Sequence, residues 1–488
     1  MGVTGKRLAG VCALLACVNV AAAGGNSALI AQNSLAASGQ PGESVAVYQQ
    51  GATLSVSVTQ AGSGDSTDIR QRGVRHAVAS DQSGQANRIV ADQILGQANT
   101  ATLKQSGAGN NIVSLQGKRQ SGVAAAVGAG NNNVVAATQT GNGNQAQVQQ
   151  QDVSAQNNTA EIVQTGDQMQ AAVFQDQAAG ARAGAYQSLG VRDGATIYQD
   201  AATSVQAEIR QQGSDNSQDI RQLGAAHVAT VGVTGDNNRN AGAPIPPETV
   251  FQQGTAHQAT IAITGSANQV SSYQTGANGQ ATLTLNGGGN QASAYQSGDR
   301  HSLGLTLAGN ANQNDLRQSG TAHVASVAVS GDRNTLKLLQ AGNGDDATLS
   351  IGGSDNNVQV DQSGSLSKVA ELLSGDANIS SITQRGDRST VNLSINGLAN
   401  KATIIQGEAG ALGNVVDVTQ IGASNVADVS QTGGNNNSAS IRQEGDRNQA
   451  LISTSGSDNQ VTIKQTGNDH SISIVRTGAG NIISVTQQ

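Results

Sequence analysis

The sequence predicts an all-β fold, an amyloid-like β-solenoid with two strands per rung, built from 22-residue repeats made of two 11-residue halves. A glycine recurs at every eleventh residue from Gly254 to Gly397, and the residue two positions before it alternates between glutamine and an aliphatic residue. Apolar and polar residues also alternate between the glycines, as in Val391-Asn392-Leu393. A period of two is typical of a β-strand with one buried face.

The composition explains why a repeat is needed. The 488 residues include 62 glycines and no tryptophan, and only 12% are charged, so the chain lacks the large side chains of an ordinary globular core. A regular repeat can still bury small side chains by stacking. The formal charge of −7 is accompanied by no basic cluster, which argues against nucleic acid as a partner.

Residues 1–23 have the features of an export signal. Lys6 and Arg7 supply the positive end, Leu8–Val20 the apolar run, and Ala21–Ala23 a small-residue cleavage site. The apolar run is too short to cross a membrane as a helix, and no other stretch approaches that length. We therefore expect export through the periplasm to the cell surface or the extracellular space, without a membrane span.

Both cysteines, Cys12 and Cys17, lie in this first segment. The mature chain would therefore contain no disulfide. Leu14 to Cys17 also resembles a lipoprotein cleavage box, which would leave Cys17 as a lipidated N-terminus.

The remaining chain divides by the regularity of its repeat. Residues 24–47 are an N-terminal segment, either a cap or a secretion-targeting element. Irregular repeats follow over 48–239, a proline-rich loop insertion over 240–249, and regular repeats over 250–488 with a slip at 407–413. The insertion contains three of the four prolines, which are poorly suited to a paired strand.

Stacked rungs would place each residue over its equivalent 22 positions later, about 4.8 Å away. A buried amide is costly alone, but in a stack each amide can donate to one neighbour and accept from the other. The sequence therefore predicts two buried ladders. The Gln ladder consists of Gln252, Gln274, Gln296, Gln318, Gln340, Gln362, Gln384 and Gln406. The Asn ladder consists of Asn268, Asn290, Asn312, Asn334, Asn356, Asn378 and Asn400.

All seven aromatic residues directly precede a glutamine, and three of them, Phe251, Tyr273 and Tyr295, would stack on successive rungs. Strand alternation places these side chains opposite the buried glutamines, so we expect an exposed aromatic stripe. Its rings either stabilise the stack across rungs or contact a ligand or a neighbouring molecule.

All six histidines occupy the position five residues after the repeat glutamine or its equivalent, as His301 and His323 do on adjacent rungs. The favoured interpretation is a polar position at the start of a strand, which Asp345, Ser367 and Ser389 share. A metal site of stacked imidazoles is the disfavoured alternative, since no carboxylate or thiol recurs beside them. Protonation of the His301–His323 pair is expected to loosen this region through repulsion of like charges.

No Ser-His-Asp or Cys-His arrangement can be nominated apart from the repeat. The recurring Gly-Asp-Arg turns, such as residues 298–300, lack the nine-residue calcium-binding repeat. We therefore expect no catalytic residue, no cofactor and no metal site. A β-helix enzyme acting on polysaccharide is disfavoured, because its acidic residues would have to break the repeat.

The repeat resembles the curlin repeat of curli fibre subunits, S-x5-Q-x-G-x2-N-x-A-x3-Q. Residues 443–454 have the first Gln, Gly, Asn and Ala of that pattern and depart from it at Thr454. Residues 82–87 fit its first half. Ile395 to Gln406 follows the pattern with isoleucine in place of the first glutamine.

This resemblance implies an amyloid subunit that is exported through an outer-membrane pore. It implies end-to-end self-association through open solenoid edges, together with other curli-like subunits, into surface fibres that support biofilm, adhesion and aggregation. The chain has more repeats than the major curli subunits. A nucleating subunit, or a monomeric surface-displayed adhesin that binds carbohydrate or a host surface, is therefore the alternative.

Overall fold

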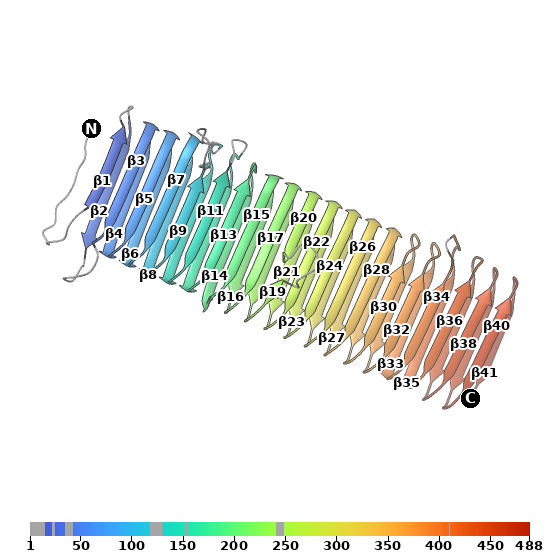
Figure 1. The fold of residues 1–488 in the computed structure, drawn as a ribbon. Coiled ribbons are helices and arrows are strands. Elements are labelled where there is room, and N and C mark those ends of the chain that lie inside the picture. Colours follow the sequence, from blue (N-terminus) through green and yellow to red (C-terminus); the bar gives the residue numbers. More distant parts are fainter. Residues whose placement is uncertain are drawn as a thin grey trace, which may run out of the picture. The chain divides into compact units, whose positions relative to one another are not determined.

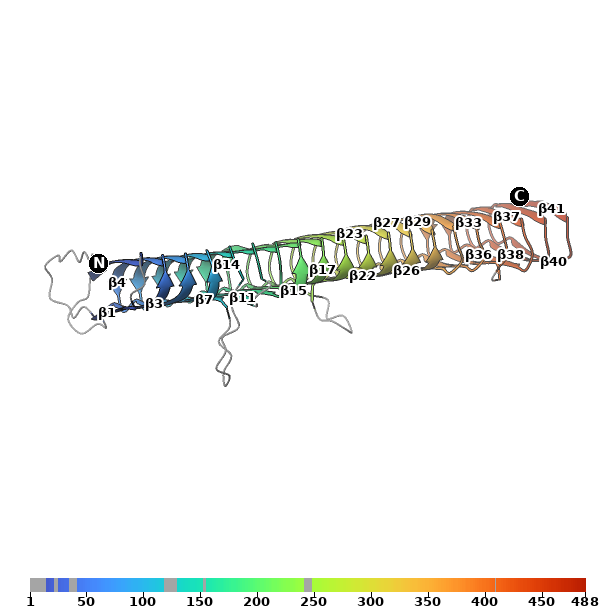
Figure 2. The same cartoon turned by 90° about the horizontal axis from the view of Figure 1, so that it is seen from above.

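The computed structural model describes residues 15–21, 25–34, 42–117, 130–151, 155–240, 248–408 and 410–488. These residues contain strands and turns but no helix, which confirms the predicted all-β class. They form two compact units: the described residues up to 240 together with 248–256, and residues 257–488. Within each unit the strands lie side by side in two facing sheets, here called A and B (Figures 1 and 2).

In the first unit, successive strands alternate between the two sheets. Sheet A holds β1 (Leu15–Ala21), β3 (Ser44–Ala52), β5 (Ser66–Val74), β7 (Arg88–Gln97), β9 (Asn111–Gln116), β11 (Gln145–Gln151), β13 (Gln170–Asp176), β15 (Gly194–Thr203), β17 (Ser217–Ala225), β19 (Arg239–Asn240) and β20 (Val250–Thr255). Sheet B holds β2 (Ser27–Ser34), β4 (Ser55–Ser63), β6 (Ala77–Gln85), β8 (Thr100–Ala108), β10 (Val134–Asn142), β12 (Thr159–Asp167), β14 (Arg182–Val191), β16 (Gln206–Gln212) and β18 (Val228–Thr234).

The second unit has the same alternation. Its sheet A holds β22 (Gln269–Ala277), β24 (Gln291–Asp299), β26 (Gln313–Thr321), β28 (Thr335–Asn343), β30 (Asn357–Gln362), β32 (Ile379–Gln384), β34 (Lys401–Gln406), β36 (Val426–Thr432), β38 (Gln449–Ser455) and β40 (Ser471–Thr477). Its sheet B holds β21 (Gln258–Thr264), β23 (Gln280–Asn286), β25 (Ser302–Ala308), β27 (Val324–Ser330), β29 (Asp346–Gly352), β31 (Lys368–Ser374), β33 (Thr390–Leu398), β35 (Val415–Ala423), β37 (Ser438–Glu444), β39 (Gln460–Thr466) and β41 (Ile482–Gln487).

All of these sheets are parallel, and each strand pairs with the equivalent strand one rung away. In the second unit, partners such as Gln274 and Gln296 are 22 residues apart, which confirms the predicted repeat. In the first unit the spacing varies, since Gln105 pairs with Gln139 and Gln139 with Gln164. Equivalent positions nevertheless stay paired over most of each strand, and local register shifts, as between β12 and β14 after Thr165, absorb extra residues at three places.

Several predicted segments take part in these sheets. Strand β1 lies within the predicted export signal and pairs with β3, and β2, within residues 24–47, pairs with β4. The remaining residues of the export signal and the prolines at 244, 246 and 247 lie outside the described residues. Arg239 and Val250, on either side of the insertion, both pair with β17, so the insertion interrupts a single strand position.

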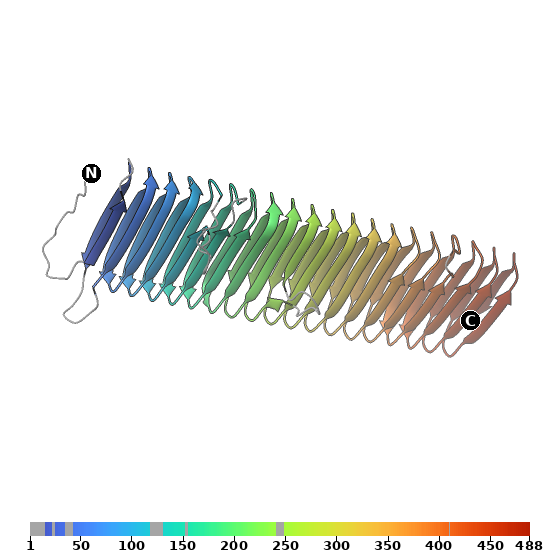
Figure 3. The ribbon, with the colours of Figure 1, turned by 45° about the horizontal axis from the view of Figure 1, so that its top comes forward.

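Glycine is required at the turns by the close approach of successive rungs (Figure 3). Gly309 has a φ of +130°, and a Cβ atom built there would lie 1.9 Å from the carbonyl oxygen of Gly331. A side chain is therefore excluded by both backbone conformation and space. The eleven-residue recurrence of glycine reflects this contact between rungs.

The core of each unit lies between its two sheets. Alternate residues point inward, as Ile261, Leu283 and Leu305 do in sheet B of the second unit, where each is fully buried or nearly so. Alanine, valine, isoleucine and leucine side chains fill this thin core and remove apolar surface from water. Strand alternation therefore decides which residues are buried in most strands, such as β21, β23 and β25.

Candidate functional site

A ladder of glutamine amides runs through sheet A of the second unit. Each Nε2 donates to the Oε1 of the glutamine one rung further on, at 2.8 Å from Gln274 to Gln296 and from Gln296 to Gln318. The same bond links Gln318, Gln340, Gln362, Gln384, Gln406 and Gln431 in turn, at 2.8–3.2 Å. Gln252 lies in the first unit, where it accepts the same bond from Gln222 at 2.9 Å.

The second hydrogen of each amide is used across the core. Gln274 Nε2 also donates to the carbonyl oxygen of Gln258 in sheet B at 2.9 Å, and Gln296 does the same with Gln280. The amide therefore bonds along the stack and also ties the two sheets together. Both of its N–H groups are satisfied in the dry core, where an unmet donor would cost about 1–3 kcal/mol.

In the asparagine ladder, both backbone and side-chain groups form the hydrogen bonds between rungs. Asn290 donates its backbone N–H to the Oδ1 of Asn268 at 3.1 Å. Its Nδ2 donates to the same Oδ1 at 3.0 Å and to the carbonyl oxygen of Gly309 at 2.8 Å. The same backbone bond links each later member to the one before it, through Asn312, Asn334, Asn356, Asn378 and Asn400. These side chains fasten each turn to its neighbours.

The first unit carries a glutamine ladder in both sheets. In sheet B, Gln60 donates to Gln82 at 2.8 Å and Gln82 to Gln105 at 2.9 Å, and the bonds continue through Gln139, Gln164, Gln187 and Gln211. The spacing of eleven between Gln49, Gln60 and Gln71 is the sequence signal for this second ladder. A spacing of eleven places glutamine in both sheets, whereas a spacing of 22 places it in one.

In sheet B of the second unit, aliphatic residues replace these glutamines over seven rungs, namely Ile263, Leu285, Leu307, Val329, Ile351, Leu373 and Ile395. Glutamine returns at Gln420, which donates to Gln443 at 3.0 Å. The Oε1 of Gln420 is buried and has no hydrogen-bond partner in the part of the chain that the structure describes. The reason is its register partner, Ile395, which offers no donor.

The predicted exposed aromatic stripe is wrong at one position. Tyr273 and Tyr295 stack with ring centroids 4.9 Å apart, and Tyr295 is 40% exposed. Phe251 is only 9% exposed. It lies in the first unit, where the strand re-enters sheet A after the insertion next to the buried Thr249 and Val250. Its register partner is Arg221, whose guanidinium lies 3.7 Å from Glu248.

Five of the six histidines are buried in the turns, and His470 is partly buried. His301 and His323 stack with centroids 5.2 Å apart and are almost fully buried. His323 Nε2 lies 3.0 Å from the carbonyl oxygen of Ser319, which can only accept, so this nitrogen carries the hydrogen. Nδ1 then accepts from the backbone N–H of Asp345 at 3.2 Å.

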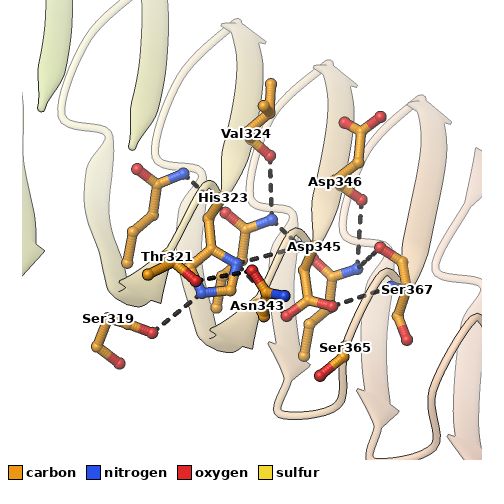
Figure 4. A network of polar contacts seen from close by, with 12 residues as sticks. Ser319, Thr321, His323, Val324, Asn343, Asp345, Asp346, Ser365 and Ser367 are labelled. Atoms are coloured by element: carbon orange, nitrogen blue, oxygen red, sulfur yellow. Dashed lines mark hydrogen bonds and ion pairs between the residues drawn. The ribbon is translucent and has the colours of Figure 1, made fainter. Parts of the chain in front are cut away.

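Asp345 continues this column on the next rung (Figure 4). Its Oδ1 accepts from the backbone N–H of Ser367 at 3.0 Å, and its Oδ2 lies 3.5 Å from His323 Nδ1. Burial lowers the pKa of His323 and raises the pKa of Asp345 to about 7. The core therefore favours the uncharged form of each side chain over an ion pair.

Glu371 is a buried carboxyl group at a position that sequence reasoning passed over. It is 3% exposed and lies in an aliphatic column of sheet B, between Leu349 and Leu393. Ser380, on the facing sheet A, lowers the pKa of Glu371 through a weak hydrogen bond, and no other hydrogen-bond partner lies among the described residues. Burial raises the pKa of Glu371 to about 7. Its shared parity with Val369 and Leu373 was the signal that it points inward.

Two further features bear on function. Within the described residues, no three His, Cys, Asp or Glu side chains gather as the ligands of a metal ion would. The part of the chain that the structure covers also contains no helix with the length and apolar character of a membrane span.

Stacked parallel rungs with internal amide ladders define a repeat protein of the β-solenoid class. Residues 434–467 match the family model of the curlin associated repeat, which confirms the resemblance found in the sequence. This match lies where Gln443 donates to Gln465, in the rungs that again carry glutamine in sheet B. A search of curated proteins finds no match. The chain is therefore a β-solenoid repeat protein that contains a match to the curlin associated repeat over residues 434–467.

Proposed function

We propose that the protein is a secreted structural subunit of extracellular, curli-like amyloid fibres that support biofilm matrix, cell adhesion and aggregation. The observation that carries the proposal is the single polarity of the amide ladders. Each glutamine donates toward the next rung and accepts from the previous one, so a second copy can extend a ladder with the same bonds. The matched curlin repeat supports the same assignment.

The terminal strands have complementary groups for head-to-tail addition. Gln32 donates to Gln60, and its own Oε1 has no partner among the described residues. At the other end, Gln487 accepts from Gln465 at 3.0 Å. Strand β41 pairs with β39 along one edge, and an unpaired strand edge recruits another chain. We expect Gln487 Nε2 of one copy to donate to Gln32 Oε1 of the next.

Two lysine substitutions on β41 test this assembly. Val485 points inward and Ser484 outward, so Val485→Lys places a charge inside the joint, whereas Ser484→Lys leaves it on the outer face. Purified mature chain should form fibres seen by electron microscopy and raise thioflavin fluorescence. Val485→Lys should abolish growth and Ser484→Lys should preserve it.

Persistent monomer at high concentration of the unmodified chain would contradict the proposal and favour the monomeric adhesin. Equal fibre growth by both lysine variants would instead contradict the proposed joint while leaving the fibre assignment intact. By the same resemblance, other curli-like subunits and an outer-membrane secretion pore are the proposed partners. Co-purification of the exported chain with such a pore would test that part.

A further inference from the structure

Two columns of inward residues lie in the turns, one directly before the strands of sheet A and one directly before the strands of sheet B. In both columns, a side-chain donor meets the carbonyl oxygen of a turn glycine. Before sheet A, Asn216 Nδ2 donates to the carbonyl oxygen of Gly235 at 2.7 Å. Before sheet B, Ser367 Oγ donates to the carbonyl oxygen of Gly386 at 2.8 Å. A side chain at these positions therefore suits the fold when it can donate a hydrogen bond.

Asp193 takes this place one rung before Asn216 and is fully buried. Its Oδ1 accepts from the backbone N–H and from Nδ2 of Asn216, at 2.9 and 3.2 Å. Its Oδ2 is buried without a hydrogen-bond partner among the described residues. A Cβ atom built on Gly190 would contact both this Oδ2 and the carbonyl oxygen of Gly213. The two oxygens therefore border the same space, and a hydrogen lies between them only when Asp193 is protonated.

Asp345 takes the equivalent place before Ser367 in the other column and is also fully buried. Its Oδ1 accepts from the backbone N–H of Ser367 at 3.0 Å, and its Oδ2 has no hydrogen-bond partner in the described chain. A Cβ atom built on Gly342 would contact both this Oδ2 and the carbonyl oxygen of Gly364. The nearby His323 Nδ1, at 3.5 Å, already accepts the backbone N–H of Asp345. The groups that face Oδ2 are therefore acceptors.

An ionised carboxylate suits neither position, because it can only accept hydrogen bonds and its charge is costly to bury. Burial raises the pKa of Asp193 to about 6, and the charges of Asp215 and Asp236 act in the same direction. Burial also raises the pKa of Asp345 to about 7, with a further contribution from Asp387. The carboxylates around each site therefore favour its protonated form.

No basic side chain offsets these effects in the part of the chain that the structure describes. Arg192, the neighbour of Asp193 in the sequence, is bonded to Asp215 at 2.7 Å. Burial lowers the pKa of His323, so this ring is neutral next to Asp345 at neutral pH. Neither buried aspartate has an ion pair with lysine or arginine among the described residues.

We propose that Asp193 and Asp345 are proton-binding sites, at which a neutral carboxylic acid takes the place of an amide or hydroxyl donor. Each Oδ2–H donates to the carbonyl oxygen of the facing turn glycine, Gly213 or Gly364, and so joins two rungs. Removal of the proton leaves two acceptors facing each other without a hydrogen between them. The first unit has one of these sites and the second has the other, so each unit is weakened as the solution becomes alkaline.

The direction of this pH dependence follows from the protonation of the folded and unfolded states. The folded-state pKa values of about 6 for Asp193 and about 7 for Asp345 exceed the ordinary value of 3.8. The contribution of each site to stability is therefore fully present below pH 3.8 and is lost as the pH rises through the folded-state value. Folding is thus coupled to proton uptake at these turns, and this coupling is independent of the proposed fibre function.

Carbon-13 NMR of the mature full-length chain, labelled only at aspartate carboxyl carbons, tests the proton directly. Two signals should titrate with midpoints of about 6 and about 7, and they should disappear in Asp193→Asn and Asp345→Asn, respectively. Asp355 is the exposed control, since its hydrogen bond from Arg333 lowers its pKa below 3.8. Midpoints below about pH 5 for both Asp193 and Asp345 would overturn the proposal.

Denaturant titration at pH 5 and pH 8 tests what the proton does. Between these values, the fall in the ratio of folded to unfolded chain should be at least about tenfold smaller in Asp345→Asn than in the unmodified chain, because the amide donates at both pH values. Asp345→Val keeps neither the charge nor a donor, so it should be less stable than Asp345→Asn at pH 8. The exposed control Asp355→Asn should leave the pH dependence unchanged. An unchanged pH dependence in Asp345→Asn, or equal stability of Asp345→Val and Asp345→Asn, would refute donation to the glycine carbonyl oxygen.

Discussion

In sheet B of the first unit, one inward position carries Gln60, Gln82 and Gln105, whereas the second unit carries Ile263, Leu285 and Leu307 at the equivalent position. Sheet A carries glutamine at this position in both units. Over these rungs the two units therefore build the same fold but fill the sheet B half of the core with amides in the first unit and with aliphatic side chains in the second, where amides return only from Gln420.

A glutamine ladder therefore requires glutamine on consecutive rungs of one column. Within a ladder, an inner glutamine such as Gln296 donates to one adjacent rung and accepts from the other. A change of residue type leaves a defect at the boundary, as the buried and unpartnered Oε1 of Gln420 shows next to Ile395. An aliphatic column has no such boundary requirement, because its packing is non-directional.

The largest expected loss of stability comes from substitution of the turn glycines, which have the same close contact in both units. Gly84→Ala in the first unit and Gly309→Ala in the second each place a Cβ 1.9 Å from the carbonyl oxygen of the next glycine. Each change should lower the free energy of unfolding by at least about 3 kcal/mol. Denaturant titration should show similar losses for both, and a loss in only one unit would contradict their equivalence.

Gly109→Ala is the control for this pair. Gly109 has a φ of +66° and no heavy atom within 4 Å of a built Cβ. Nearby alanines such as Ala86 and Ala98 adopt the same backbone region. The change should therefore cost less than about 1 kcal/mol.

Glu371→Leu should stabilise the second unit by completing its aliphatic column. The folded-state pKa of about 7 exceeds the ordinary value of 4.5, so the folded state binds the proton more tightly than the unfolded state. Stability is fully present below pH 4.5 and is lost as the pH rises toward 7. The variant should remove this slope and gain about 3 kcal/mol at pH 8. Denaturant titration from pH 5 to 8 measures both, and Glu408→Leu at an exposed turn is the control.

Two substitutions by glutamine test whether a buried amide costs less stability next to an existing ladder than inside an aliphatic column. Ile351→Gln places an amide among aliphatic neighbours, and we expect a cost of about 2–4 kcal/mol. Ile395→Gln should cost about 1–2 kcal/mol less, because its Nε2 can donate to the unpartnered Oε1 of Gln420. Equal costs in denaturant titration would argue that continuity of the ladder does not contribute to stability.

The smallest expected effect is the pH response of the stacked histidines. Burial lowers the pKa of His301 and His323 below the ordinary value of 6.5, so the unfolded state binds protons more readily. Stability is present above pH 6.5 and is lost as the pH falls through the folded pKa. Hydrogen exchange at pH 7 and pH 4 should show reduced protection of β24–β28 at the lower pH.

The double variant His301→Asn with His323→Asn should show a weaker decrease, since Asn437 and Asn459 occupy the same position on later rungs. Asp345 opposes the histidines, because its raised pKa of about 7 stabilises the fold toward lower pH. Unchanged protection of the unmodified chain between the two pH values would count against the histidine effect.

Much of the fold could be predicted because strand alternation and the eleven-residue period are written residue by residue. The inward glutamines and asparagines followed directly from that period. Phe251 was placed on the outside by the same rule, yet it is buried at the edge of an insertion whose course the period does not describe. Glu371 obeys the alternation and was missed because a carboxyl group was not expected inside an aliphatic column.

The sequence by itself determined the two strands per rung, the glycine turns and the polarity of the inward positions, because each depends on neighbours along the chain. Only the tertiary structure decided that the irregular repeats of the first unit stay in register, that each glutamine also bonds across the core, and that Asp193 and Asp345 face the carbonyl oxygens of turn glycines. These features depend on which residues of different rungs and sheets meet. That matching is set by turn length and by the geometry of packing.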